Sequence, residues 1–139
     1  MARQRGTAAA RARRLSVGLT FDTGALIALE RRHQRMARVY ATAVGDGILI
    51  TVPAVVIAEW WRGRSDAREM ILRGVRVEAT SVDLARLAGE ALAAVPGATA
   101  IDALVMASAA RRGDIVYTSD VGDLEQLRSY FPAVRLLAV

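Results

Sequence analysis

The stretch SVGLTFDTGALIALERR, residues 16–32, joins a predicted strand directly to a predicted helix. Residues 16–21 are a short, mostly apolar run that indicates a strand, and residues 22–32 indicate a helix that begins at once after it. Asp22 stands at the junction of the two. Because strands that pass directly into helices are typical of α/β proteins, this stretch is the first indication of the fold class.

The same alternation continues to the end of the chain. Further strands are predicted at residues 48–52, 75–80, 115–119 and 134–139. Further helices are predicted at residues 34–47, 53–61, 65–74, 81–95, within 96–113, and at 123–131, with Pro53 in the first turn of its helix. No hairpin dipeptide separates neighbouring strands, so the sequence predicts a three-layer α/β/α sandwich around a mostly parallel sheet.

Composition limits the class of protein. The chain has 139 residues, of which 53% are hydrophobic, so it can bury a sizeable core. It has no cysteine, which excludes disulfides and thiolate metal sites. No apolar run approaches the roughly 18 residues that cross a membrane. The basic N-terminal stretch is not followed by an apolar core typical of a signal peptide, so secretion is not expected. A cytoplasmic protein is therefore expected.

Charge is unevenly distributed along the chain. Residues 1–17 carry five arginines and no acid, whereas the remaining residues carry 14 arginines and 14 acids. We therefore predict a basic, disordered tail over residues 1–17 and a single domain over residues 18–139. The one histidine, His33, lies in the polar stretch RRHQR and is expected at the surface rather than as a catalytic base.

Five acids stand at positions that a ligand site would use. Asp22 ends the first predicted strand, and Asp120 follows the strand at 115–119, with Asp123 three residues further on. In open α/β sheets, ligands bind outside the carboxyl ends of the strands. Two more acids interrupt apolar segments: Glu59 lies in VPAVVIAEWW and Asp102 in ATAIDALVMASAA.

Each acid alone has a structural explanation. Asp22, Asp120 and Asp123 could cap helices, and Asp102 could sit in a first turn behind a Thr99 cap. Glu59 could belong to a solvated face, although its neighbours are nearly all apolar. Together, carboxylates with no matched basic partners would repel one another unless a cation neutralised them. Oxygen ligands without cysteine or a nearby histidine indicate Mg²⁺ or Mn²⁺, which can activate water for phosphoryl displacement.

Four blocks of the sequence resemble the PIN-domain ribonucleases, and most closely the VapC-type toxins of bacterial toxin–antitoxin pairs. The blocks are FDTGALIALE, TVPAVVIAEWWRG, TAIDALVMASAARRG and IVYTSDVGDLEQL. They occur in order at plausible spacing, and the resemblance covers about residues 18–139. The basic N-terminal stretch departs from the family pattern, which usually starts almost at the first strand.

The resemblance implies a metal-dependent endoribonuclease whose catalytic and metal-binding residues are Asp22, Glu59, Asp102, Asp120 and Asp123. Of the last two acids, Asp120 is preferred slightly over Asp123 as the direct ligand of the metal ion. Thr23, Thr118 and Ser119 would support the site. The resemblance also implies an RNA substrate, a cognate antitoxin that covers an apolar groove and, by family analogy, a homodimer.

An acidic pocket repels RNA, so arginines on its rim must attract the phosphates. The densest cluster is Arg31, Arg32, Arg35 and Arg38, and its spacing predicts that residues 31, 35 and 38 share a helix face. A solvated face is the alternative interpretation. Arg62, Arg64 and Arg68 are second candidates.

The residues are compatible with two other functions. A non-catalytic PIN-like scaffold is one, although such a scaffold would be expected to lose an acid. An acidic-site signalling domain is the other, but it would need adjacent acids after the first strand and a lysine, and the chain has no lysine. Trp60 and Trp61 cannot both point inward from one helix, because adjacent positions diverge by about 100°. One of them is therefore a candidate contact for a partner.

Overall fold

The computed structural model describes residues 17–139. The disordered tail predicted for residues 1–17 lies, apart from Val17, outside this range. The described part contains a five-stranded, fully parallel sheet with strand order β3-β2-β1-β4-β5. The strands are β1 (Leu19–Phe21), β2 (Ile50–Pro53), β3 (Arg76–Glu78), β4 (Ile115–Thr118) and β5 (Arg135–Ala138).

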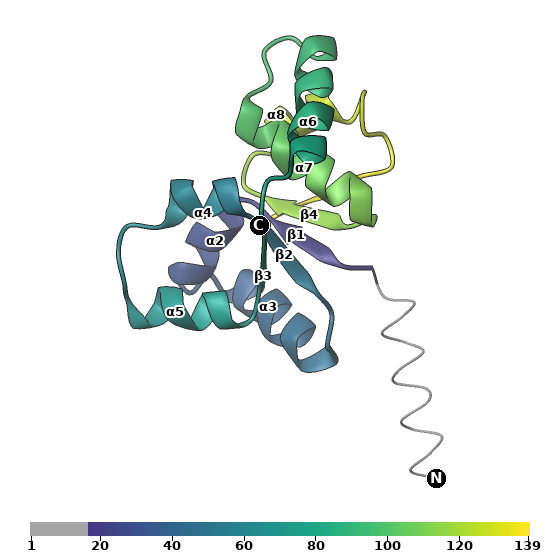
Figure 1. Ribbon diagram of the computed structural model, residues 1–139. Helices are drawn as coiled ribbons and strands as arrows, with labels where there is room; N and C mark the ends of the chain where they lie inside the picture. Colours follow the sequence, from purple (N-terminus) through teal and green to yellow (C-terminus); the bar gives the residue numbers. More distant parts are fainter. Residues whose placement is uncertain (1–16) are drawn as a thin grey trace, which may run out of the picture.

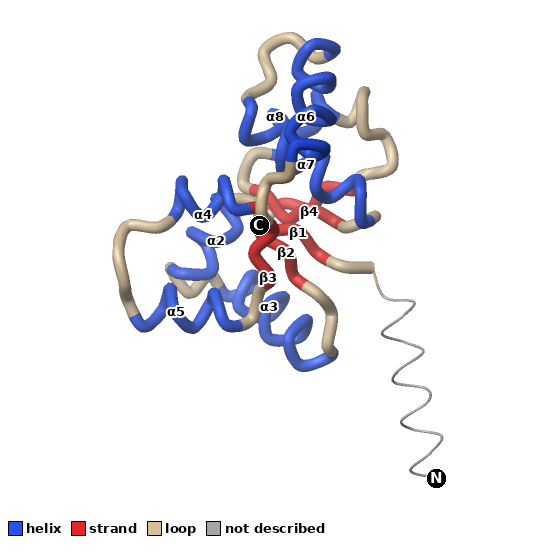
Figure 2. The backbone as a smooth tube through the Cα atoms, in the orientation of Figure 1, coloured by secondary structure: helices blue, strands red, loops and turns tan. Residues whose placement is uncertain are grey.

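Helices cover both faces of this sheet, as Figures 1 and 2 show. On one side lie α2 (Thr23–Glu30), α3 (Gln34–Asp46), α4 (Ala54–Trp60) and α5 (Asp66–Arg73). On the other lie α6 (Val82–Ala94), α7 (Ala100–Arg112) and α8 (Val121–Leu127). The predicted three-layer sandwich is confirmed. Within residues 17–139, no helix combines the length and the apolar character needed to span a membrane.

The strand order reverses beside β1. The chain moves outward from β1 to β2 and β3, then crosses back to place β4 on the other side of β1 and β5 beyond it. Connections that leave neighbouring strands in opposite directions open a crevice at the carboxyl ends of those strands. Asp22 directly follows β1, and Ser119 and Asp120 directly follow β4, so the crevice is bordered by residues that the sequence had singled out.

Burial on both faces explains the composition of the strands. All three residues of β1 and all four of β2 are buried, as expected for a parallel sheet between helix layers. Phe21 is fully buried and meets the ring of Tyr117 edge to face at 5.8 Å. From α7, Val105 and Met106 are among the fully buried side chains.

Capping residues mark the ends of several helices. The hydroxyls of Ser65, Ser81 and Thr99 each accept a hydrogen bond from the backbone amide three residues on, at the starts of α5, α6 and α7. Gly47 ends α3 in the left-handed conformation with φ of 70°, which glycine adopts without steric cost.

Two predicted helices have wrong boundaries, by one residue at the start of α4 and by two and four residues at the start and end of α8. Pro53 ends β2 and precedes α4, so it is not in the first helical turn. Helix α8 spans Val121–Leu127 and not 123–131, since this register buries both Leu124 and Leu127 and the chain turns before the buried Phe131.

The predicted arginine face is also wrong. Arg31 caps the C-terminus of α2, and Arg32 follows in a left-handed conformation with φ of 59°. Helix α3 begins only at Gln34 and carries Arg35 and Arg38. Because the helix breaks between them, Arg31 does not share a helix face with the other two.

A polar network anchors α7 to the sheet. The Arg112 guanidinium donates to Asp114 at 2.9 Å, to the Thr20 hydroxyl at 2.9 Å and to Glu78. Thr20 in turn donates to Asp114 at 2.8 Å, and Ser108 donates to Glu78 at 2.8 Å. The network joins the C-terminal end of α7 to β1 and β3. It therefore fixes the helix whose first turn carries Asp102.

Candidate functional site

Five carboxylates line one cavity of about 460 Å³ at the crevice between β1 and β4. They are Asp22, Glu59, Asp102, Asp120 and Asp123. They come from separate segments: the β1–α2 junction, the end of α4, the first turn of α7, and the start of α8. The fold thus brings together all five acids that the sequence singled out.

Asp22 serves both as a helix cap and as a wall of the cavity. Its Oδ1 accepts a hydrogen bond from the Ala25 amide at 2.9 Å. This position places the carboxylate at the positive end of the α2 dipole. The capping interpretation and the ligand interpretation of Asp22 therefore do not exclude each other.

The environment of Asp22 disfavours its charged form. The pKa of Asp22 is raised from 3.8 to about 6: burial raises it most and the negative charges of Asp102 and Asp120 add to this, while hydrogen bonds from the Thr118 hydroxyl and the Ala25 amide act in the opposite direction. Burial likewise raises the pKa of Asp102, with smaller upward contributions from Asp123, Asp120 and Glu59. The acids are close enough to influence one another's ionisation.

Glu59 is exposed, although it lies in an apolar stretch. The neighbouring Trp60 turns inward and is 3% exposed, while Trp61 is half-buried beyond the end of α4. The Glu59 Oε1 accepts a hydrogen bond of 2.6 Å from the Thr23 hydroxyl. The desolvation penalty that the sequence suggested for this carboxylate is therefore absent, and Thr23 holds it at the cavity.

Thr118, Ser119 and Gly24 shape the loop beside the acids. Thr118 is fully buried, and its hydroxyl accepts a hydrogen bond of 2.9 Å from the backbone amide of Asp120. A Cβ at Gly24 would lie 1.9 Å from the Ser119 Oγ and 2.5 Å from its Cβ. The close approach of α2 to this loop therefore requires glycine. Gly24 was not among the predicted site residues, although it stands two residues after Asp22.

The donor set fits a hard divalent cation. All five side chains offer carboxylate oxygens, the ligands that Mg²⁺ and Mn²⁺ prefer. The raised pKa values of Asp22 and Asp102 reflect burial and mutual repulsion, which a cation between them would offset. Within residues 17–139, no three carboxylate or imidazole side chains converge closely enough, as they stand, to hold an ion. Ion binding therefore requires these side chains to draw together.

Asp22→Asn should stabilise the metal-free protein at neutral pH. Because the folded-state pKa of about 6 exceeds the ordinary 3.8, the folded state binds the proton more tightly, and wild-type stability falls as the pH rises between these values. Asparagine carries no charge and caps helices as well as aspartate does. Urea unfolding in EDTA should show a gain of up to about 3 kcal/mol at about pH 8 and only about 0.5 kcal/mol at about pH 4. An equal gain in stability at both pH values would contradict the raised pKa of Asp22 in the folded protein.

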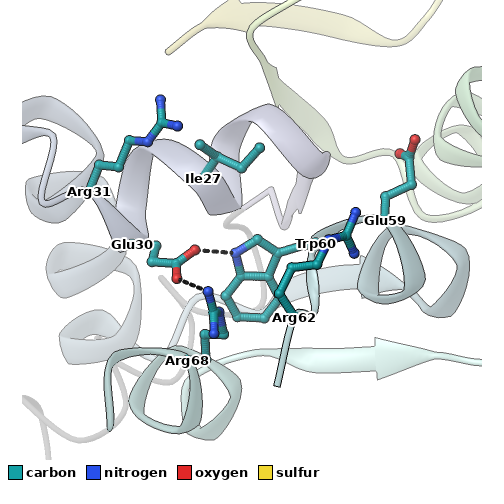
Figure 3. Close-up of a pocket in the computed structure, with 7 residues that line it drawn as sticks. All are labelled: Ile27, Glu30, Arg31, Glu59, Trp60, Arg62 and Arg68. Atoms are coloured by element: carbon teal, nitrogen blue, oxygen red, sulfur yellow. Dashed lines mark hydrogen bonds and ion pairs between the residues drawn. The ribbon is translucent and has the colours of Figure 1, made fainter. Parts of the chain in front are cut away.

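A second, basic cavity adjoins the acidic one, and Ile27 and Glu59 line both. It measures about 370 Å³ and is also lined by Glu30, Arg31, Trp60, Arg62 and Arg68 (Figure 3). Glu30 accepts a hydrogen bond from the Trp60 Nε1 at 3.0 Å and pairs with Arg68 at 2.8 Å.

The structure separates the predicted arginine cluster. Of its four members, Arg31 lines the basic cavity. Arg32 lines a different groove with Tyr40 and Met70, and Arg35 and Arg38 are exposed on α3. Two second candidates, Arg62 and Arg68, join Arg31. His33 is exposed, as predicted.

Comparison with known proteins identifies related folds. The family model of the PIN domain matches residues 19–128, a range that includes all five acids. A chain in the crystal structure of VapBC2 from Rickettsia felis bound to a DNA fragment from their promoter superimposes with a TM-score of 0.69 at 12% identity, over 87% of this chain and 98% of that chain. No curated protein has a sequence that matches this chain.

Two further solved structures have the same fold. A chain of the DNA-bound VapBC from Salmonella typhimurium gives a TM-score of 0.66 at 14% identity and covers 88% of this chain and 98% of that chain. A chain of FitAcB from Neisseria gonorrhoeae gives a TM-score of 0.60 at 18% identity and covers 86% of this chain and 96% of that chain.

Proposed function

The chain belongs to the PIN domain family, and from this premise we propose that it is a metal-dependent endoribonuclease, the VapC-type toxin of a toxin–antitoxin pair. One observation carries the proposal. Five carboxylates from separate segments line a single cavity at the carboxyl ends of β1 and β4. A purely structural role would not need five like charges around one cavity, because their repulsion destabilises the fold.

In this proposal Asp22, Asp102 and Asp120 hold Mg²⁺ or Mn²⁺, and Glu59 and Asp123 complete the site directly or through water. The ion, when bound, would lower the pKa of a water molecule and offset the charge that develops at the scissile phosphate. Thr118 holds the loop that carries Asp120, and Thr23 orients Glu59 toward the cavity. One of the carboxylates accepts the proton of the attacking water.

The proposed partner is a small antitoxin. The support is the likeness of this chain to chains of the VapBC and FitAcB structures, named for two components. A homodimer and a cytoplasmic location remain predictions from the sequence.

Removing the metal should abolish RNA cleavage by the wild-type protein. We expect labelled single-stranded RNA to be cleaved internally with Mg²⁺ or Mn²⁺, to stay intact in EDTA, and to be cleaved again when excess Mg²⁺ is restored. Gel analysis of 5′-labelled fragments reports the products, and single-stranded DNA serves as the substrate control. RNA that stays intact under every metal condition would refute the nuclease proposal, and binding without cleavage would favour the scaffold alternative.

A further inference from the structure

The acidic cavity cannot by itself attract a polyanion. It is lined by five carboxylates, and the lining residues, all of which lie in the described range, include no arginine or histidine. A nucleic-acid strand that places one phosphate among these acids must be held through its other phosphates. The adjoining basic cavity shares Glu59 and Ile27 with the acidic one, so the strand can reach it without leaving the surface.

The charges in the basic cavity are only partly neutralised. Three arginines face two glutamates there. Glu30 forms an ion pair with Arg68 and accepts a hydrogen bond from the Trp60 indole. Glu59 accepts a hydrogen bond from the Thr23 hydroxyl. Neither Arg31 nor Arg62 forms an ion pair with a carboxylate within residues 17–139. Two guanidinium groups therefore remain available to an anionic ligand.

The Arg62 side chain is hydrogen-bonded to the backbone beside the cavity. The Arg62 Nη1 donates to the Trp61 carbonyl at 2.8 Å and to the Ala58 carbonyl at 3.4 Å, which holds the guanidinium at the end of α4. The Trp60 indole is buried and fixed by Glu30. Figure 3 shows Trp60 and Arg62 between the Glu30–Arg68 pair and Glu59. A charge held in place loses less side-chain entropy when it binds a ligand.

We propose that this basic cavity, through Arg31 and Arg62, binds the RNA phosphate next to the one that is cleaved. The inference rests on the proposed nuclease function and adds to it a second phosphate site, on the side of α2 and α4. A guanidinium suits this role because its planar donors match phosphate oxygens in pairs. Binding at this site would draw the strand across Glu59 into the acidic cavity.

The test compares charge-matched double variants. Arg31→Ala with Arg62→Ala removes the proposed contacts, whereas Arg86→Ala with Arg111→Ala removes two exposed arginines of α6 and α7, on the other side of the sheet. In the Asp22→Asn background with Mg²⁺, anisotropy measures binding of a fluorescein-labelled single-stranded RNA of about 12 nucleotides. We expect Kd to rise about tenfold for the first pair and less than about twofold for the second. The slope of log Kd against log salt should fall by about 0.7, the value for one contact to a single-stranded phosphate.

Substrate length provides a second measurement in the otherwise wild-type protein. A dinucleotide has one phosphodiester and no neighbouring phosphate, so the Arg31/Arg62 variant should cleave it as the wild type does. With the longer RNA the same variant should show a raised KM and a kcat within about threefold of wild type. Lysine at both positions should restore part of the affinity, since it keeps the charge but not the paired donors.

Several outcomes would overturn the proposal. One is equal RNA affinity and salt slope in the two double variants. Another is a larger loss in Arg35→Ala with Arg38→Ala, which would place RNA on α3. A loss confined to binding of an acidic, glutamate-rich peptide would assign the cavity to a protein partner. Absence of RNA cleavage by the wild type would refute only the proposed nuclease function. The binding measurement would still test the basic cavity, because it does not depend on cleavage.

Discussion

Asp22→Asn should reduce RNA cleavage at least about a thousandfold while the protein stays folded. Asp22 is a partly buried acid of the cavity, and its ionisation is coupled to Asp102 and Asp120. A metal ion that stabilises charge in the transition state contributes several kcal/mol, and each 1.36 kcal/mol is a factor of ten in rate. Losing a charged ligand removes much of that contribution.

The substitution separates chemistry from folding. The side-chain oxygen of asparagine can still accept the hydrogen bond from the Ala25 amide, so α2 keeps its N-terminal cap. In EDTA the variant should be more stable than the wild type, as argued above, so a loss of activity cannot be assigned to unfolding. Initial rates of cleavage at saturating Mg²⁺ give the measurement.

Asp83→Asn provides the matched control for this variant. Asp83 is an exposed acid in the first turn of α6 and is not among the residues that line the cavity. It should cleave RNA at the wild-type rate. If Asp22→Asn also kept the wild-type rate, Asp22 would not be a ligand of the ion and the proposed site would be wrong.

Arg112→Ala should lower the free energy of unfolding by about 3–5 kcal/mol, the range measured when one partner of a buried ion pair is removed. The Arg112 side chain is 17% exposed, and its partner Asp114 is 5% exposed. Without the guanidinium, Asp114 would keep its negative charge beneath α7 with only the Thr20 hydroxyl as a donor, whereas Glu78 would keep the Ser108 hydroxyl and the more exposed Arg76 at 3.6 Å. Neutral hydroxyls cannot replace the lost cation.

Arg111→Ala is the control for this change. Arg111 is the preceding residue of α7 and is exposed, so its removal should change stability by less than about 0.5 kcal/mol. Urea unfolding of the metal-free protein, followed by tryptophan fluorescence, measures both variants. A loss of less than about 1 kcal/mol for Arg112→Ala would mean that the network is not important for anchoring α7.

Local patterns were sufficient to predict the fold. The alternation of short apolar runs with helical segments identifies every strand and helix of the described chain, and the serine and threonine caps mark three helix starts. The predicted family and fold class are both confirmed. The errors at Pro53 and α8 concern boundaries, where burial of Leu124 and Leu127 outweighed local sequence signals.

Contacts between distant segments could not be predicted. The sequence interpretation placed Arg31 with Arg35 and Arg38 because it counted residues along one continuous helix. In the structure Arg31 instead lies in a cavity with Arg62, in the loop after α4, and with Arg68 of α5. Glu59 was expected to be costly to bury, yet it is exposed and held by Thr23, which precedes it by 36 residues.

The sequence by itself determined the order of strands and helices and the identity of the acids, because hydrophobic periodicity and capping are local properties of a chain. The tertiary structure alone decided which side chains share a site. Thr20 and Arg112 meet across 92 residues, and the acidic and basic cavities meet along Glu59. Such pairings depend on the strand order around β1, and strand order is set by how the helices pack on the two faces of the sheet.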